Sequence, residues 1–299
     1  MRRIILIMTV LVLFFTIPVF FKEKEQSIKL GNDHTKLEKH NFSRVLVSPP
    51  RFSSDLYQSI TNLDLTKIKN TDYKKPIEWG ENVTGVIRSI PTEEKIIALT
   101  FDACGGEWGS GYDDELINYL IAENIPATLF INSRWIDTNL DKFLYLSSLE
   151  QFQIENHGTE HRPLSVNGLT AWGIKGTSSV EEVVEEVISN YEKIKKLTGH
   201  SSKYFRSGTA FYDEVAVKIV NELGMNVVNY DILGDAGATF SAQQVRNSLL
   251  NSKPGSIALL HMNQPKKETA AGVKMAVPLL REKGFTFVTL DEGFNRSNR

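Results

Sequence analysis

The sequence has a single cysteine, Cys104, among 299 residues, so no disulfide can form within the chain. This absence excludes a small domain held together by disulfides, although it does not exclude export. Charge of one sign is also lacking, because 34 basic residues nearly balance 36 acidic ones and the formal net charge is −2. The sequence therefore gives no electrostatic reason to expect nucleic acid as a partner. Internal repeats and low-complexity blocks are absent as well, and the length suits one large domain or two small ones.

The amino terminus carries an uncharged run of 18 residues, 4–21, in which Ile, Leu, Val and Phe predominate. This length is close to the roughly 20 residues that span a bilayer. The run lacks both a small-residue cleavage site and a lipid-accepting cysteine, which favours an uncleaved signal-anchor within residues 1–25 over a cleaved signal peptide. We therefore expect an extracytoplasmic protein that is anchored in the membrane or associated with the cell wall, and a secreted one if the segment is cleaved.

Composition divides the rest of the chain into a polar spacer, residues 26–75, and a globular domain, residues 76–299. In the domain, apolar runs of strand length alternate with helical patterns. The clearest helix is 180–197, which begins with a capping box formed by Ser179 and Glu182 and is followed by Gly199. The predicted strands are 96–101, 127–131, 152–156, 204–206, 226–230, 256–261 and 286–290.

Alternating strands and helices predict an α/β fold with a parallel sheet and helical crossovers. About seven such units fit a single domain of this size. We therefore predict a distorted, seven-stranded (β/α) barrel, preceded by the amino-terminal hydrophobic helix and the polar spacer. A doubly wound open sheet is the alternative.

Titratable side chains follow the predicted strands at their carboxyl ends. The first strand is almost entirely apolar and is followed directly by Asp102. In parallel α/β folds these strand ends share one face, where the chemistry is placed. An isolated Asp at such a point also caps turns, so the other strand ends decide the interpretation. Five ends carry such groups: Asp102; His157 and His161; Arg206; Asp231 and Asp235; and His261.

His157 and His161 are a candidate metal pair, because neutral imidazoles are good ligands of Zn²⁺ and similar ions. Their spacing of four residues suits one face of a helix, but Gly158 and Pro163 favour a turn, which can also aim both rings at one point. Arg206 ends a buried strand, where it requires a carboxylate partner. The convergence of all five groups is difficult to attribute to turn formation alone.

Taken in order, these motifs resemble those of the polysaccharide deacetylases of carbohydrate esterase family 4, over residues 95–294. Thr100-Phe101-Asp102 resembles the first motif, in which the Asp is the general base. His157-Gly158-Thr159-Glu160-His161 resembles the second, the metal-binding histidine pair. Arg206 matches the arginine that pairs with the base.

The last two motifs complete the resemblance. The loop 231–235 resembles the motif whose Asp orients the catalytic histidine, and either Asp231 or Asp235 fits that role. Leu259-Leu260-His261 resembles the final motif, in which Leu lines the acetyl pocket and His is the general acid. The ordered set is much more specific than any of its members.

Two places depart from the family pattern: the third motif, Arg206-Ser207-Gly208-Thr209, lacks the prolines often found there, and the residue after the base is changed. The residue after the base is usually a second Asp, the third protein ligand of the metal, and here it is Ala103. Alanine cannot bind a metal, so a neighbouring side chain is needed to join the two histidines. Cys104 is adjacent, and a thiolate binds Zn²⁺ well. The other candidates are nearby acidic residues, namely Asp102, Glu107, Asp113 and Asp114.

The resemblance implies metal-dependent removal of acetyl groups from N-acetylated amino sugars, with Zn²⁺ or Co²⁺ as the ion. The expected substrate is a glycan that contains N-acetylglucosamine or N-acetylmuramic acid, and an exported protein favours peptidoglycan over chitin. Trp172 and Tyr212 are candidates for stacking on sugar rings, as are Trp108 and Trp135. The stretch 162–178 is long for a loop and is a candidate cover of the cleft. Two alternatives stay open: a catalytically silent glycan-binding protein of the same fold, and a hydrolase of a related amide or ester.

Overall fold

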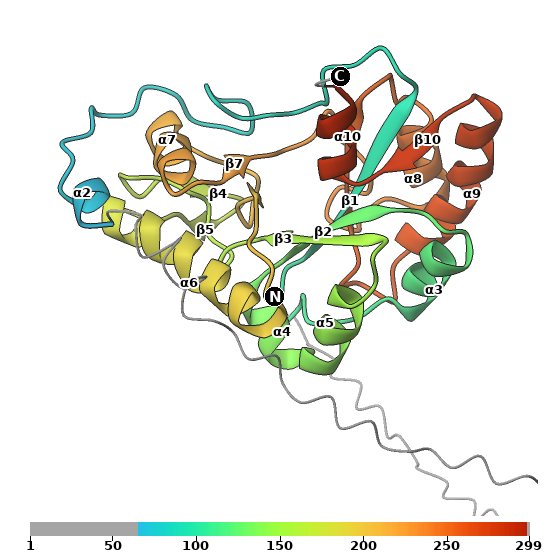
Figure 1. The fold of residues 1–299 in the computed structure, drawn as a ribbon, viewed down its shortest axis with the longest axis horizontal. Coiled ribbons are helices and arrows are strands. Elements are labelled where there is room, and N and C mark those ends of the chain that lie inside the picture. The colour runs from blue at the N-terminus through green and yellow to red at the C-terminus, as the bar shows by residue number, and fades with distance from the viewer. Residues whose placement is uncertain (1–64, 298–299) are drawn as a thin grey trace, which may run out of the picture. The chain divides into compact units, whose positions relative to one another are not determined.

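A parallel sheet forms the centre of residues 65–297, the part of the chain that this computed structural model describes (Figure 1). Seven strands follow the path β7-β6-β3-β2-β1-β9-β8, and β10 pairs with the first half of β1. Every pairing in this sheet is parallel. The strands are β1 (Ile96–Ala103), β2 (Ala127–Ile131), β3 (Phe152–Asn156), β6 (Tyr204–Phe205), β7 (Asn226–Val227), β8 (Ile232–Leu233), β9 (Ser256–His261) and β10 (Thr286–Val288).

Helices pack around this sheet (Figure 1). They include the long α6, which lies on the same side as α7, and the pair α8 and α9 on the other side. The helices are α2 (Leu65–Lys69), α3 (Asp114–Ala122), α4 (Ser133–Thr138), α5 (Leu140–Ser147), α6 (Val180–Thr198), α7 (Glu214–Glu222), α8 (Ala242–Leu249), α9 (Thr269–Glu282) and α10 (Leu290–Ser297).

The two ends of the strand path lie close together in the chain. Only residues 228–231 separate β7 from β8, so the two strands are at most about 18 Å apart along the chain. The sheet therefore curls into a distorted barrel that is not closed by a β7–β8 ladder among the described residues. The predicted α/β fold class, a distorted (β/α) barrel, is confirmed.

β1 is the central strand because it is apolar on both faces. All eight of its residues are buried, and it pairs with β2, β9 and β10. Helices cover both sides of parallel sheets, which is why such strands have continuous apolar sequences. The carboxyl end of β1 is thereby fixed at the middle of the sheet.

The capping box predicted for Ser179 and Glu182 forms only by half, because the Glu182 carboxylate accepts a hydrogen bond from the backbone N–H of Ser178 and not from that of Ser179. The Ser179 side chain accepts a hydrogen bond from the backbone N–H of Glu182, and α6 ends at Gly199 with a left-handed φ of 77°. Ser241 and Gln244 form a complete capping box at the start of α8. These local bonds satisfy backbone groups that the first turn of a helix leaves unpaired.

Several elements differ from the prediction. The strands at 226–230 and 286–290 are shorter than expected, and β8 is an additional strand. The stretch 162–178 contains a hairpin made of β4 (Thr170–Ala171) and β5 (Ile174–Lys175).

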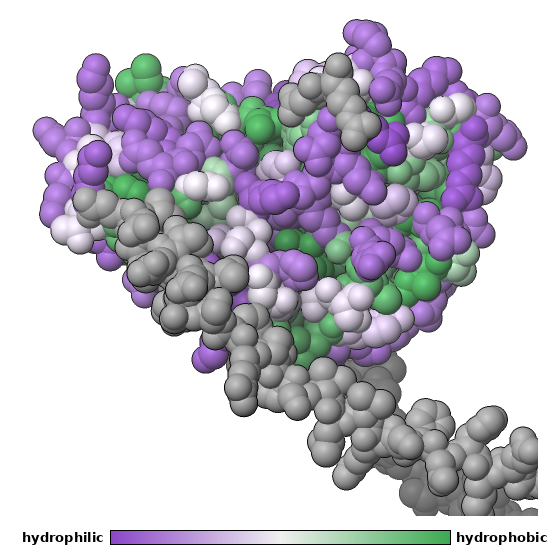
Figure 2. All heavy atoms as spheres, viewed as in Figure 1, coloured by the Kyte–Doolittle hydropathy of each residue, from purple (hydrophilic) through white to green (hydrophobic). Residues whose placement is uncertain are grey.

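The predicted signal-anchor and most of the spacer lie outside the described residues, so the domain boundaries stay predictions. At the start of the described part, Ile68 of α2 is buried in the hydrophobic cluster that α6 and α7 also form. Within residues 65–297, every helix is too short or too polar to cross a membrane. Hydrophilic residues cover most of the face seen in Figure 2, with smaller hydrophobic patches between them.

Candidate active site

The pairing of β1 with β9 brings the first and last predicted motifs together. Asp102 on β1 is the register partner of His261 on β9. Neighbouring strands lie about 5 Å apart, so these two residues are adjacent at the carboxyl edge of the sheet.

Arg206 holds Asp102 inside the barrel. Its Nη1 donates hydrogen bonds to Oδ1 of Asp102 at 2.8 Å and to Oγ1 of Thr100 at 2.9 Å. Its other nitrogens donate to two backbone carbonyls of segment 228–229, and its guanidinium lies over the ring of Phe130. Arg206 is fully buried and Asp102 is 3% exposed. A buried pair with this many hydrogen bonds has its charge compensated and its carboxylate fixed in orientation.

The second oxygen of Asp102 faces His157. Oδ2 of Asp102 lies 3.6 Å from Nε2 of His157, while Nδ1 of His157 lies 2.9 Å from the backbone carbonyl of Arg206. A carbonyl oxygen only accepts hydrogen bonds, so Nδ1 carries the proton. In the neutral ring, Nε2 then has a free lone pair, as a metal-binding histidine requires.

Glu186 of α6 holds the loop that follows β3. Its carboxylate accepts hydrogen bonds from the backbone N–H groups of Thr159, Glu160 and Arg162 at 2.9–3.2 Å. Burial raises the pKa of Glu186 to about 7, although these hydrogen bonds oppose the shift. At Gly158, where φ is 77°, a Cβ would lie 2.4 Å from Oε1 of Glu186. The two histidines therefore lie in a turn, and the arrangement on one helical face does not occur.

His161 lies at the other end of this turn. It has a left-handed φ of 60°, and its ring centroid is 4.9 Å from that of His157. A Cβ at Gly208 would lie 2.3 Å from the carbonyl carbon of His161, so only glycine fits there. Nε2 of His161 is buried and has no hydrogen-bond partner in the described part of the chain. An unpartnered buried nitrogen beside a second imidazole fits a metal ligand.

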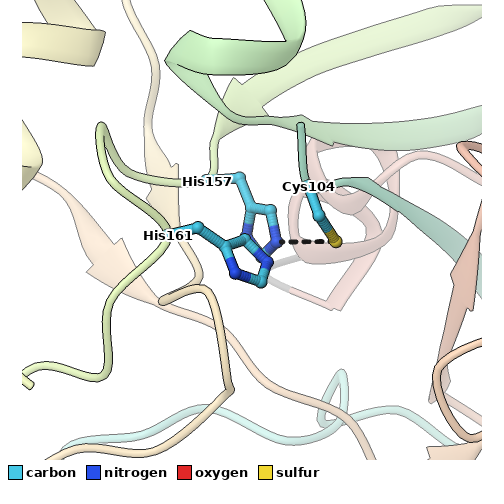
Figure 3. Close-up of side chains that lie close together, drawn as sticks. All are labelled: Cys104, His157 and His161. Carbon is cyan, nitrogen blue, oxygen red and sulfur yellow. Dashed lines mark hydrogen bonds between the residues drawn. The ribbon is translucent and has the colours of Figure 1, made fainter. Parts of the chain in front are cut away.

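Cys104 completes this pair, as Figure 3 shows. Its Sγ lies 3.9 Å from Nε2 of His157, and the ligand atoms of Cys104, His157 and His161 all lie within 4.8 Å of one another. Among residues 65–297, no other group of three or more His, Cys, Asp or Glu side chains meets this criterion. One thiolate and two imidazoles are a donor set that suits Zn²⁺.

The neighbours of Cys104 favour its ionised form. Burial opposes ionisation of the thiol, but the imidazoles of His161, His157 and His261 outweigh this effect and hold its pKa well below the ordinary value. The thiolate is the form that binds metals.

None of the acidic alternatives to Cys104 joins the group that it forms with His157 and His161. Asp113 caps α3, and Asp114 forms an ion pair with a lysine of α5. Glu107 is exposed, and Asp102 is bound by Arg206. The Cys104 thiol is therefore the side chain that groups with both histidines, although Oδ2 of Asp102 also lies 3.6 Å from Nε2 of His157.

His261 is held by Asp235 and not by Asp231. Its Nδ1 lies 2.8 Å from Oδ1 of Asp235, and its backbone N–H donates to Oδ2 at 2.8 Å. Burial by itself would lower the pKa of His261, but the charge of Asp235 outweighs burial and raises that pKa well above its ordinary value. The pKa of Asp235 is lowered in spite of its burial, mainly by His261. Asp231 instead accepts hydrogen bonds at the start of β9.

The chain wraps tightly around Asp235. Residues 236–238 all have left-handed backbone, with φ values of 48°, 70° and 60°. Such a conformation costs a non-glycine residue roughly 1–2 kcal/mol. The two N–H groups of residues 239 and 240 both donate to the carbonyl of Asp235 and close the turn.

The residues predicted to contact substrate fall into two groups. Tyr212 and Trp135 are fully buried, and the Tyr212 hydroxyl bonds Ser207 and Asn229, so stacking on a sugar is wrong for both. Leu259 is 7% exposed and lies on the same face of β9 as the terminal histidine, two residues away. Trp172 and Trp108 are 76% and 82% exposed.

Two residues of the site are absent from the predictions. Asn132 donates hydrogen bonds to the carbonyls of His157 and Gly158 at 2.9 and 2.8 Å, and Glu186 holds the same turn from the other side. A sequence signal exists for each. Glu186 lies three residues after Val183, on the buried stripe of its helix, and Asn132 directly follows the apolar β2.

Comparisons with known proteins relate this chain to one family. Residues 89–228 match the family described as polysaccharide deacetylase. A peptidoglycan-N-acetylglucosamine deacetylase of Bacillus cereus is 25% identical over 208 residues, which are 68% of this chain and 90% of the relative.

Solved structures share the fold. A family 4 carbohydrate esterase from Bacillus anthracis aligns with a TM-score of 0.56 and 29% identity, over 71% of this chain and 88% of the esterase. A carbohydrate esterase family 4 pseudoenzyme from the same organism aligns with a TM-score of 0.59 and 18% identity, over 70% of this chain and 68% of the pseudoenzyme. The predicted family resemblance is confirmed.

Proposed function

Because this chain matches the polysaccharide deacetylase family and has its fold, we propose that it is a metal-dependent hydrolase that removes acetyl groups from N-acetylated amino sugars. The single observation that carries the proposal is the cluster of Cys104, His157 and His161 beside the pairs Asp102–Arg206 and His261–Asp235. These groups supply a metal site, a base and an acid within one region.

Cys104, His157 and His161 are the residues that would hold the ion. The unpartnered Nε2 of His161 and the low pKa of the Cys104 thiol support this assignment, and the sulfur and nitrogen donors favour Zn²⁺, with Co²⁺ as the alternative. When bound, such an ion polarises a carbonyl and lowers the pKa of a coordinated water.

Asp102 is the proposed general base. Arg206 occupies one of its oxygens, so the other oxygen, which faces His157, is the one that accepts the proton of the attacking water. The Arg206 guanidinium is in turn fixed by backbone carbonyls, so the carboxylate does not have to reorient during the reaction.

His261 is the proposed general acid. Nδ1 is engaged by Asp235, which leaves Nε2 as the donor to the departing amine. The Asp235 carboxylate raises the pKa of the ring, which favours its protonated form, and fixes its direction. This assigns the orienting role to Asp235, and Leu259 on the same face is placed to contact the acetyl group.

Peptidoglycan is the proposed substrate, with N-acetylglucosamine or N-acetylmuramic acid as the unit attacked. The relative from Bacillus cereus acts on peptidoglycan N-acetylglucosamine, and the predicted signal-anchor would place this domain outside the cytoplasmic membrane, next to the wall. Neither the similarity to this relative nor the predicted signal-anchor depends on the proposed metal site.

The test is acetate release from N-acetylglucosamine oligomers by protein stripped with a chelator and reloaded with Zn²⁺ or Co²⁺. We expect release that depends on the ion and falls at least 100-fold in Asp102→Asn. Asp231→Asn is the matched control, because this carboxylate lies at the other end of β9. Folded protein that releases no acetate with either ion would overturn the proposal.

A catalytically silent glycan-binding protein is the second candidate, and Ala103 is the observation that favours it. The fold is shared with a pseudoenzyme, so the fold alone does not imply activity. Metal content after purification separates the two functions, because stoichiometric Zn²⁺ supports the hydrolase and an ion-free protein that binds sugar supports the binder.

A further inference from the structure

Trp172 is an exposed tryptophan in a backbone conformation that disfavours it. It occupies the first of the two loop positions between β4 and β5, with a φ of 53°, and Gly173 follows with a φ of 78°. Two-residue hairpin loops of this kind prefer Asn-Gly, because a bulky side chain is strained at positive φ. The Trp172 side chain is 76% exposed, so little burial offsets this strain. Backbone strain of this sort, at an exposed aromatic ring, points to a function.

The exposed ring is part of a row of three. The Trp172 ring meets Phe211 edge to face, with centroids 5.7 Å apart, and Phe211 is in turn tilted against Trp79 at 5.8 Å. Backbone hydrogen bonds between Gly80 and Tyr212, 3.0 Å in both directions, fix the last two rings relative to each other. We call Trp79, Phe211 and Trp172 the aromatic row.

Arg162 ties the hairpin to the turn that carries the histidines. It directly follows His161, and its guanidinium donates hydrogen bonds to the carbonyls of Lys175 and Gly176. The backbone N–H of Thr177 also donates to the carbonyl of Pro163 at 3.1 Å. The position of Trp172 is therefore set by the same segment that supplies a candidate metal ligand.

The loop 206–212 connects the aromatic row to the site from the other side. Arg206 binds the Asp102 carboxylate, Gly208 contacts the backbone of His161, and Phe211 follows three residues later. Three residues span at most about 10 Å, so the row begins within one or two sugar units of the histidine pair.

We propose that the aromatic row binds a second sugar ring of the glycan whose acetylated unit lies at Asp102 and His261. The apolar C–H face of a pyranose packs on the electron-rich face of an aromatic ring, and here the exposed ring of Trp172 is supported by the half-buried rings of Phe211 and Trp79. The substrate is then an oligomeric glycan and not a free amino sugar. This inference rests on the proposed function, because it extends the same site.

Trp172→Asn is the variant that tests the row. Asparagine adopts the left-handed conformation readily, so the replacement removes the ring and the strain together. We expect its melting temperature to be equal to or above that of the wild type, while its affinity for an N-acetylglucosamine hexamer falls about tenfold or more. A merely structural role of Trp172 would produce the opposite result, a lower melting temperature. Tyr145→Ala removes an exposed ring from α5 and is the control.

Binding of the hexamer is measured by calorimetry on chelator-treated protein, so that no reaction accompanies it, and acetate release is measured separately. Weaker binding in Trp172→Asn but not in Tyr145→Ala supports the proposal, even if the protein releases no acetate. The proposal is overturned if the wild type and Trp172→Asn bind the hexamer equally well. It is also overturned if the wild type binds no hexamer. Either result counts against the aromatic row even when acetate release is normal.

Discussion

Asp235 sets the proton chemistry of His261, and its replacement gives the most specific prediction at the scale of single residues. In Asp235→Asn the charge that raises the His261 pKa is lost, while the burial that lowers it stays. A general acid works only while protonated, so activity disappears as the pH rises through its pKa. The alkaline limb of the pH profile of kcat/KM therefore moves to lower pH, and the rate at neutral pH falls about 100-fold.

The control for this prediction is Asp231→Asn, since Asp231 bonds only the start of β9 and not the histidine. Its alkaline limb should coincide with that of the wild type. A limb that stays in place in Asp235→Asn would show that the proton is donated by another group.

Sequence predicts the residue types of this site better than their orientations. Each strand end shows which groups reach the edge of the sheet, because parallel strands share one direction. The sequence does not show which neighbouring side chain replaces a missing ligand. Side chains alternate along β1, so residue 104 emerges on the side of Asp102, whereas Ala103 packs into the core. That alternation is a sequence signal for Cys104, but it applies equally to Asp102, so the sequence alone does not choose between these two residues.

At the scale of elements, α6 and the histidine turn form one unit through Glu186. The Glu186 pKa is raised to about 7 by burial, against about 4.5 in the unfolded chain. The folded state therefore binds a proton more readily, and the unfolding free energy falls as the pH rises from about 4.5 to 7. The glutamine amide stays neutral, so the unfolding free energy of Glu186→Gln does not fall in this way. Between these two pH values, it should therefore rise by about 3 kcal/mol relative to that of the wild type.

Urea denaturation at pH 5 and pH 8 measures this difference, and Glu185→Gln, on an exposed position of the same helix, is the control. A difference between the Glu186→Gln variant and the wild type that is the same at both pH values would contradict a carboxylate whose pKa is raised in the folded state.

Elements with strong local signals were predictable, and those set by distant contacts were not. The boundaries of α6 follow from its apolar stripe and its two caps. β8 and the β4–β5 hairpin are each formed by very short strands, and their pairing depends on partners that the local sequence does not identify. The hairpin in particular depends on Arg162, which has no recognisable pattern in the sequence.

At the scale of the whole molecule, the alternation of apolar strands and helices was sufficient to predict the barrel. It was not sufficient to show that the predicted strand at 286–290 pairs with β1, beside the path of the other seven strands, because that pairing brings together residues almost 200 positions apart in the chain.

The proposed metal site also links distant parts of the fold, since Cys104 follows β1 and both histidines follow β3. An ion that binds only the folded state stabilises it, by about 4 kcal/mol at 1,000 times its Kd. For a domain of this size we expect Zn²⁺ to raise the melting temperature by roughly 10 °C over chelator-treated protein. Cys104→Ala should lose most of this increase. Mg²⁺, which prefers oxygen ligands, serves as the control and should produce no increase.

The most direct measurement of the proposed metal site is X-ray absorption at the zinc edge of the reconstituted protein. A ligand set of Cys104, His157 and His161 predicts one sulfur at about 2.3 Å together with nitrogen or oxygen at about 2.0–2.1 Å, and loss of the sulfur in Cys104→Ser. A spectrum of the wild type that contains only nitrogen and oxygen neighbours would contradict the proposal that Cys104 replaces the missing carboxylate.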